Sequence, residues 1–157
     1  MTERSPVEPG GMRRTRAAAA PAWRYVLGGM LAAALAVAGN LAWRSAFPAY
    51  SGYSVPALID ETSVTLASAL SVLLAAGVYL LLSRGLTIAT PLYVLGSLLT
   101  AAASCVATYV PVMPDGTPTP PGFTELTLPM HLFAGVMAAV VVPLVVLLGV
   151  RAQAPSA

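Results

Sequence analysis

Four long apolar runs, separated by short polar segments, dominate the sequence. The runs cover residues 23–43, 62–83, 86–110 and 126–150. A helix needs about 20 mainly apolar residues to cross the hydrocarbon core of a bilayer, and each run is about that long. The pattern therefore predicts an all-α integral membrane protein, a four-helix bundle in which residues 23–150 form one transmembrane domain.

The composition points the same way. Of the 157 residues, 57% are hydrophobic and 9% are charged, whereas a soluble domain carries about 25% charged residues. The formal net charge of +2 is spread over short clusters and forms no basic stripe, so the chain lacks a nucleic-acid footprint. We therefore expect the lipid bilayer as the main partner and no nucleic acid.

The polar segments form the ends and the connections of this domain. Residues 1–22 are polar and rich in Ala, Pro and Gly, which predicts a disordered cytoplasmic tail, and residues 151–157 form a short tail at the other end. Residues 44–60 are rich in aromatic side chains and predict a first loop in the headgroup layer. Repeated prolines make residues 111–124 a second loop, neither helix nor sheet and extended.

A second interpretation of the first run stays open. Basic residues precede its apolar core, and Ala36-Val37-Ala38 fits the small-x-small pattern of a signal-peptide cleavage site. Against this, the apolar run continues past that site to Trp43. We expect a retained first span, with a cleaved signal peptide as the alternative.

The arginines predict the orientation. A turn of about two residues at Arg84-Gly85 makes the second and third spans an antiparallel hairpin, and four spans place both termini on one side. Seven of the eight arginines fall on that side and Arg44 falls on the other; the seven are Arg4, Arg13, Arg14, Arg16, Arg24, Arg84 and Arg151. The positive-inside rule then puts both termini in the cytoplasm. Arginine without lysine, with much alanine, is typical of a GC-rich bacterial genome, so we expect a multi-pass protein of the cell (plasma) membrane.

Small or hydroxylated residues recur at every fourth position of each span. They are Gly28, Ala32, Ala36 and Asn40; Ser63, Ala67, Ser71 and Ala75; Gly96, Thr100, Ser104 and Thr108; and His131, Gly135, Ala139 and Pro143. Such a stripe lies on one helix face and lets backbones approach closely. Ala and Ser are abundant enough for some stripes to arise by chance. We nevertheless expect these faces to point inward, with Leu, Val and Ile facing lipid.

Polar side chains gather in the outer half of the predicted bundle. The candidate cluster is Asn40, Arg44, Ser104, Thr108 and His131. Ionisable groups at membrane depth are costly and mark candidate sites, but a hydrogen bond between helices, worth about 0.6–2 kcal/mol, explains such residues as well. Both explanations stay open for Asn40 and His131, while Arg44 suits an interfacial ion pair with Asp60 or Glu61.

Several classes of membrane protein are excluded by residue type. One histidine cannot make a bis-histidine haem site, and Cys105 alone cannot supply a disulfide-forming quinone enzyme. Proton-coupled small multidrug exporters need a carboxylate within a span, and the acids here lie in the tail, in loops or at helix starts. No nucleophile–base pair or metal cluster is recognisable. We therefore expect no enzyme, no cofactor and no metal.

A family resemblance rests on Asn40, on the Arg84-Gly85 turn and on Met130-His131-Leu132 at the start of the last span. On these features residues 23–150 resemble a family of small four-span actinobacterial integral membrane proteins of unknown function. The resemblance implies fold and location only.

Two functional hypotheses follow from the sequence. The first is a structural or accessory four-helix bundle that forms a homo-oligomer or joins a membrane partner. The alternative is a small transporter or ligand-binding membrane protein that uses the outer polar cluster.

Overall fold

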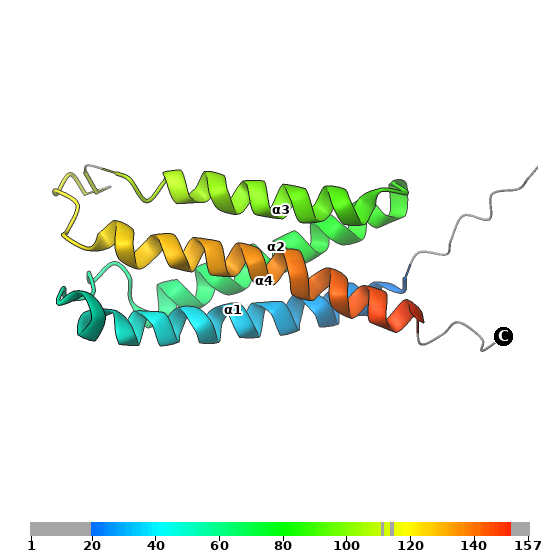
Figure 1. Ribbon diagram of the computed structural model, residues 1–157, viewed down its shortest axis with the longest axis horizontal. Coiled ribbons are helices and arrows are strands. Elements are labelled where there is room, and N and C mark those ends of the chain that lie inside the picture. The colour runs from blue at the N-terminus through cyan, green and yellow to red at the C-terminus, as the bar shows by residue number, and fades with distance from the viewer. Residues whose placement is uncertain (1–19, 111, 114, 152–157) are drawn as a thin grey trace, which may run out of the picture.

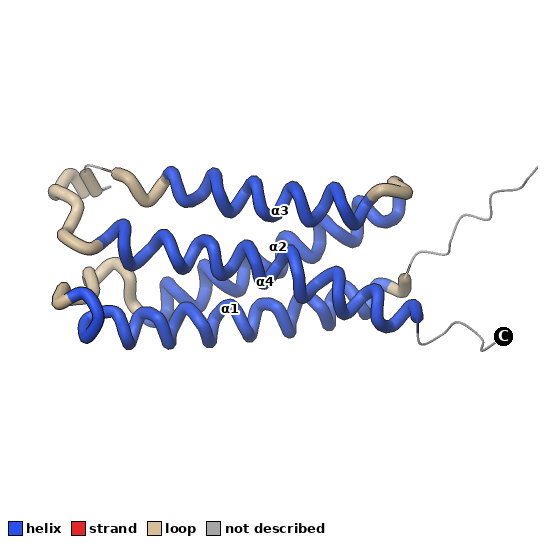
Figure 2. The backbone as a smooth tube through the Cα atoms, in the orientation of Figure 1, coloured by secondary structure: helices blue, strands red, loops and turns tan. Residues whose placement is uncertain are grey.

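The computed structural model describes residues 20–110, 112–113 and 115–151, and over these residues the fold is a bundle of four helices (Figures 1 and 2). The helices are α1 (Ala22–Ser51), α2 (Glu61–Gly85), α3 (Ala89–Val106) and α4 (Phe123–Arg151). Each is long and apolar enough to cross a membrane. This confirms the predicted all-α class and the four candidate spans. The two predicted tails lie mostly outside the described residues.

The helices run antiparallel in sequence order (Figure 1). The start of α1, the α2–α3 turn and the end of α4 lie at one end of the bundle, which we call the terminal end. The α1–α2 and α3–α4 connections lie at the opposite, loop end. Helix α1 packs against both α2 and α4, whereas α3 packs mainly on α4 and less on α2. As a result α2, α1 and α4 form a tight unit, with α3 attached to one side of it.

Small residues mark where helices cross closely. A Cβ atom at Gly28 would lie 3.1 Å from the Val142 carbonyl oxygen of α4, and one at Gly29 would lie 2.8 Å from the Ala76 Cβ of α2. Gly135 on α4 meets Ala101 on α3 in the same way. Because lipid tails give no hydrophobic drive between helices, such close backbone packing is the main attraction between spans.

The predicted inward stripe is confirmed for the first span. Gly28, Ala32, Ala36 and Asn40 are all buried. In α2 the prediction is wrong by one position, because the buried residues are Val64, Ser68, Val72, Ala76 and Tyr79. The larger side chains of α2 fill the space beside the alanines of α1. Its smaller residues are left on the face that points toward α3.

The stripes of α3 and α4 are divided between two environments. Gly96 and Thr100 are exposed, while Thr108 at the end of the same stripe is buried. On α4, Ala139 and Pro143 are buried and His131 is exposed. These helices therefore bury part of the predicted face and leave the rest on a common surface. The large exposed residues are mostly Leu and Val, as expected for side chains that face lipid.

Helix α1 continues eight residues beyond the predicted end of the first span, so the first half of the predicted loop at 44–60 is helical. Phe47 is fully buried and packs in a cluster with Ile59 and Leu126, and this burial favours helix past Arg44. Gly52 then ends the helix with a φ of 76°, a left-handed conformation that glycine adopts without steric cost.

The second connection contains a tight turn at residues 113–117, within a loop that the sequence predicted to be extended. The amide of Met113 donates to the carbonyl of Thr117 at 2.8 Å, and Val112 and Pro118 form an isolated bridge. The Asp115 carboxylate accepts hydrogen bonds from the hydroxyl and the amide of Thr117, and these bonds lower its pKa. Helix α3 also ends at Val106, four residues before the predicted end.

Candidate functional site

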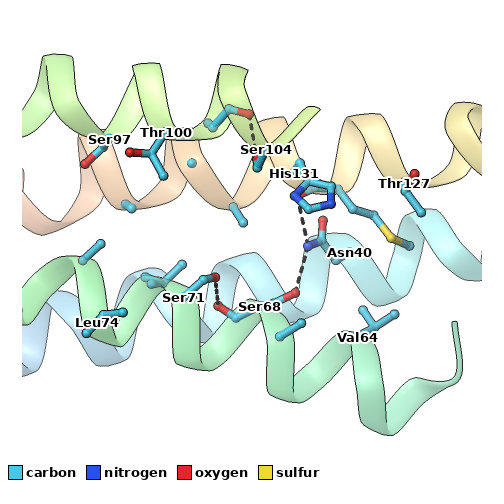
Figure 3. A pocket seen from close by; sticks show the side chains of 18 of the residues that line it. Asn40, Val64, Ser68, Ser71, Leu74, Ser97, Thr100, Ser104, Thr127 and His131 are labelled. Atoms are coloured by element: carbon cyan, nitrogen blue, oxygen red, sulfur yellow. Dashed lines mark hydrogen bonds between the residues drawn. The ribbon is translucent and has the colours of Figure 1, made fainter. Parts of the chain in front are cut away.

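A groove of about 780 Å³ lies between α2 and α3, with α4 as its floor. Figure 3 shows Ser97, Thr100 and Ser104 on α3 across from Ser71 and Leu74 on α2, with His131 between them. The groove exists because α2 and α3 share a short turn at the terminal end and pack little against each other elsewhere. Its walls are the small-residue faces that were expected to be packed in the core.

Asn40 joins three helices behind the groove. Its side chain is 3% exposed, and its amide nitrogen donates to the Ser68 Oγ at 2.9 Å and to the Met130 carbonyl at 3.3 Å. A buried amide with two partners stabilises packing and costs free energy when a partner is removed. For Asn40 this geometry supports the structural role, in which its side chain links helices by hydrogen bonds.

His131 has a different environment. It belongs to α4 one residue after Met130, lines the groove, and is exposed. Its imidazole makes no hydrogen bond with any residue in the described part of the chain. A neutral imidazole offers one donor and one acceptor. His131 is therefore free to bind a polar group in the groove.

Hydroxyl groups supply further acceptors. The Ser71, Ser104 and Thr127 hydroxyls each donate to a carbonyl of their own helix, at 3.1, 2.8 and 2.8 Å. Each hydroxyl oxygen keeps lone pairs that can accept a hydrogen bond. Together with His131, these oxygens suit a ligand that carries hydrogen-bond donors.

The terminal end of the groove is apolar. Val78, Leu82 and Leu92 line it there. Tyr93 of α3 joins the helices at this end. Its hydroxyl donates to the Ala138 carbonyl of α4 at 3.1 Å, and its ring stacks on Tyr79 of α2 at 4.5 Å between centroids. The groove is therefore amphipathic along its length. Its polar groups lie toward the loop end and in the middle, and hydrocarbon lines the other end.

Two of the predicted site residues lie elsewhere. The Arg44 Nε donates to the Ile59 carbonyl at 2.7 Å and its Nη1 is 3.4 Å from Glu61, whose side chain is exposed, so Arg44 holds the α1–α2 connection. Thr108 is buried and donates to the Cys105 carbonyl at 2.8 Å. The structure thus brings Asn40, Ser104 and His131 to the groove and leaves the other two outside it.

The sequence analysis did not include Ser71, Ser97, Thr100 and Thr127 in the site, although they line the groove. Ser97 and Thr100 are spaced i and i+3, and the predicted Ser104 follows at i+7, which places all three on one helix face. Thr127 and His131 are spaced i and i+4 on α4. This recurrence of polar groups on otherwise apolar helices was the available signal.

Comparisons with protein-family models, curated proteins and solved structures found no match to this chain. Among the described residues, no three His, Cys, Asp or Glu side chains lie close enough to hold a metal ion.

Proposed function

We propose that this protein is a multi-pass protein of the cell membrane that binds an uncharged amphiphilic molecule in the α2–α3–α4 groove. The arginine distribution supports cytoplasmic termini, which would put the polar part of the groove in the outer half of the bilayer. We also propose that the chain is one of the small four-span actinobacterial proteins that it resembles.

The observation that carries the proposal is the amphipathic lining of the groove. Ligand sites are concave, mostly apolar and furnished with a few convergent polar groups, and they have volumes of about 300–1,000 Å³. The groove matches this description with its 780 Å³ and its hydroxyl and imidazole groups. No Asp, Glu, Lys or Arg lines it. A charged headgroup would therefore lack a partner, and this favours an uncharged one with hydroxyl or amide donors.

The second candidate is an accessory role, in which the groove receives a transmembrane helix of a partner. The unpacked small residues Ala67, Ser71 and Gly96 favour it, since small faces promote helix association. The polar lining argues against it, because an apolar helix face packed in the groove would bury the His131 imidazole without a hydrogen-bonding partner. We therefore place the amphiphile first.

Native mass spectrometry from mild detergent tests the proposal. The measured mass of the wild type should exceed the mass of the polypeptide, and the excess should be smaller than the mass of a protein partner. Thr100→Phe fills the groove from α3, and it should abolish that mass without loss of folding. Leu99→Phe is the matched control, because Leu99 is 60% exposed and does not line the groove. Equal retention by the two variants would contradict ligand binding in the groove, and copurification of a stoichiometric membrane protein would favour the accessory role.

A further inference from the structure

Arg24 is buried, and two of its guanidinium nitrogens have no hydrogen-bonding partner among the described residues. It lies in the first turn of α1 and is 5% exposed, and its Nε and Nη1 are buried without an acceptor from the part of the chain that the structure describes. A buried charge without a partner costs several kcal/mol, so proteins pair such groups or bind an ion there. The Arg24 guanidinium therefore needs an acceptor that the surrounding helices do not supply.

The acids of the described chain are too far away to serve. Asp60, Glu61, Asp115 and Glu125 all belong to the connections or helix starts at the loop end. Arg24 lies at the terminal end, one turn before the Gly28–Val142 crossing of α1 and α4. A helix of 30 residues spans about 45 Å, so an ion pair between the two ends is impossible.

The position of Arg24 suggests what the acceptor is. The neighbouring Trp23 is 58% exposed, and the Arg24 Cζ lies 5.3 Å from the centre of its ring. Tryptophans at the ends of spanning helices lie at the level of lipid headgroups. The guanidinium at this depth has the donor geometry that matches phosphate oxygens.

We propose that Arg24 binds a phosphate group at the terminal end of the bundle, supplied by a phospholipid headgroup of the adjacent leaflet, and that its side chain swings outward past the exposed Trp23 ring to reach that phosphate. The site is separate from the groove, and it does not depend on what the groove binds. A free phosphate ion has the same chemistry as the headgroup phosphate, and the experiment distinguishes the two. The experiment also distinguishes both from an ion pair of Arg24 with Glu3 or Glu8, which lie outside the described residues.

The experiment measures the thermal stability of the full chain in an uncharged detergent while one additive is titrated. The additives are phosphatidylglycerol, diacylglycerol with the same acyl chains and no phosphate, and inorganic phosphate. The wild type should be stabilised saturably by phosphatidylglycerol and not by diacylglycerol. Stabilisation by inorganic phosphate alone, to the same extent, would assign the site to the free ion and overturn the lipid source.

Variants test the role of the guanidinium. Arg24→Gln should weaken the phosphatidylglycerol response by about tenfold or more in apparent affinity, as expected for the loss of charge-assisted hydrogen bonds. Arg24→Lys keeps the charge but lacks the planar guanidinium, so it should retain part of the response. This variant tests the role of the guanidinium if Arg24→Gln proves unstable. Arg84→Gln removes the same charge from an exposed position at the same end and should respond like the wild type.

Three further results would overturn the proposal. Arg84→Gln could lose as much affinity as Arg24→Gln, which would indicate a general charge effect. Arg24→Gln could lower stability yet respond normally to phosphatidylglycerol, which would indicate a purely structural arginine. The wild type could fail to respond while Glu3→Gln/Glu8→Gln responds, which would show that the tail carboxylates already occupy the guanidinium.

Discussion

At the scale of residues, Asn40 and His131 contribute to the bundle in opposite ways. Asn40 is buried and bonded to two other helices, while His131 on the neighbouring helix faces the groove without a bond from the described residues. The sequence predicted both as polar groups at a similar depth. It left open whether each one links helices by hydrogen bonds or belongs to a binding site. The difference arises from the orientation of α4, because the Met130 carbonyl accepts the hydrogen bond from Asn40 of α1 while the next residue, His131, lines the groove.

Replacing Asn40 by alanine should destabilise the bundle. The change leaves the Ser68 hydroxyl and the Met130 carbonyl without their donor, and we expect a loss of about 1–2 kcal/mol in the free energy of unfolding. Ser45→Ala is the control, since Ser45 is exposed and bonds only within its own helix. Thermal unfolding in detergent measures both variants, and an equal effect would contradict the linking role of Asn40.

Substitutions of His131 should affect ligand retention more than stability. His131→Gln keeps a donor and an acceptor and should retain the ligand at neutral pH, whereas His131→Ala should lose it. Among side chains with ordinary pKa values, only histidine changes its charge between about pH 5 and 8. Protonation turns the acceptor nitrogen of the imidazole into a second donor, so a ligand that donates to this nitrogen loses its hydrogen bond. Retention by the wild type should therefore fall as the pH is lowered over that range, and retention by His131→Gln should stay flat. Native mass spectra across the range measure this. A flat response in the wild type would remove His131 from the site.

At the scale of elements, the close crossings decide where α3 sits. Gly135 of α4 leaves room for Ala101 of α3, and this contact fixes one wall of the groove. A side chain at Gly135 must push α3 away or clash with the Ala101 Cβ atom.

Gly135→Leu should therefore lower stability by about 1–3 kcal/mol, as overpacking does. Val140→Leu is the matched control, because Val140 is 54% exposed. The neighbouring Val141 is less suitable as a control, because it is partly buried against the core. Thermal unfolding in detergent compares the two. If both variants unfold at the same temperature, α3 does not depend on the Gly135–Ala101 contact.

The hydrophobic pattern predicted the number, class and approximate bounds of the spans, because a bilayer requires long apolar helices. It did not predict that α1 would reach Ser51, since the burial of Phe47 depends on Leu126, far away in sequence. The small-residue stripes located helix faces correctly in α1 and one position off in α2. Periodicity shows that a face is small; whether a helix, a groove or lipid covers it depends on the tertiary arrangement.

At the scale of the whole molecule, the arrangement of the termini agrees with the charge distribution. The start of α1, the α2–α3 turn and the end of α4 share one end, and seven of the eight arginines belong to that end or to the tails beyond it. Reporter fusions after Arg84 and after Arg151 should both report the cytoplasm, and a fusion near Asp115 should report the outside. An external signal after Arg84 would reverse the proposed orientation. An N-terminus at Gly39 in the mature protein would instead reveal a cleaved signal peptide.

Photoaffinity labelling can map where an amphiphile binds to the bundle. An uncharged long-chain alcohol with a photoreactive group in its chain is added to the purified protein, and the labelled peptides are sequenced with and without excess unreactive alcohol. We predict labelling of groove residues such as Ser71, Ala75 and Thr100 that the unreactive alcohol suppresses. Labelling confined to lipid-facing leucines such as Leu95 and Leu144, or unaffected by the competitor, would contradict it.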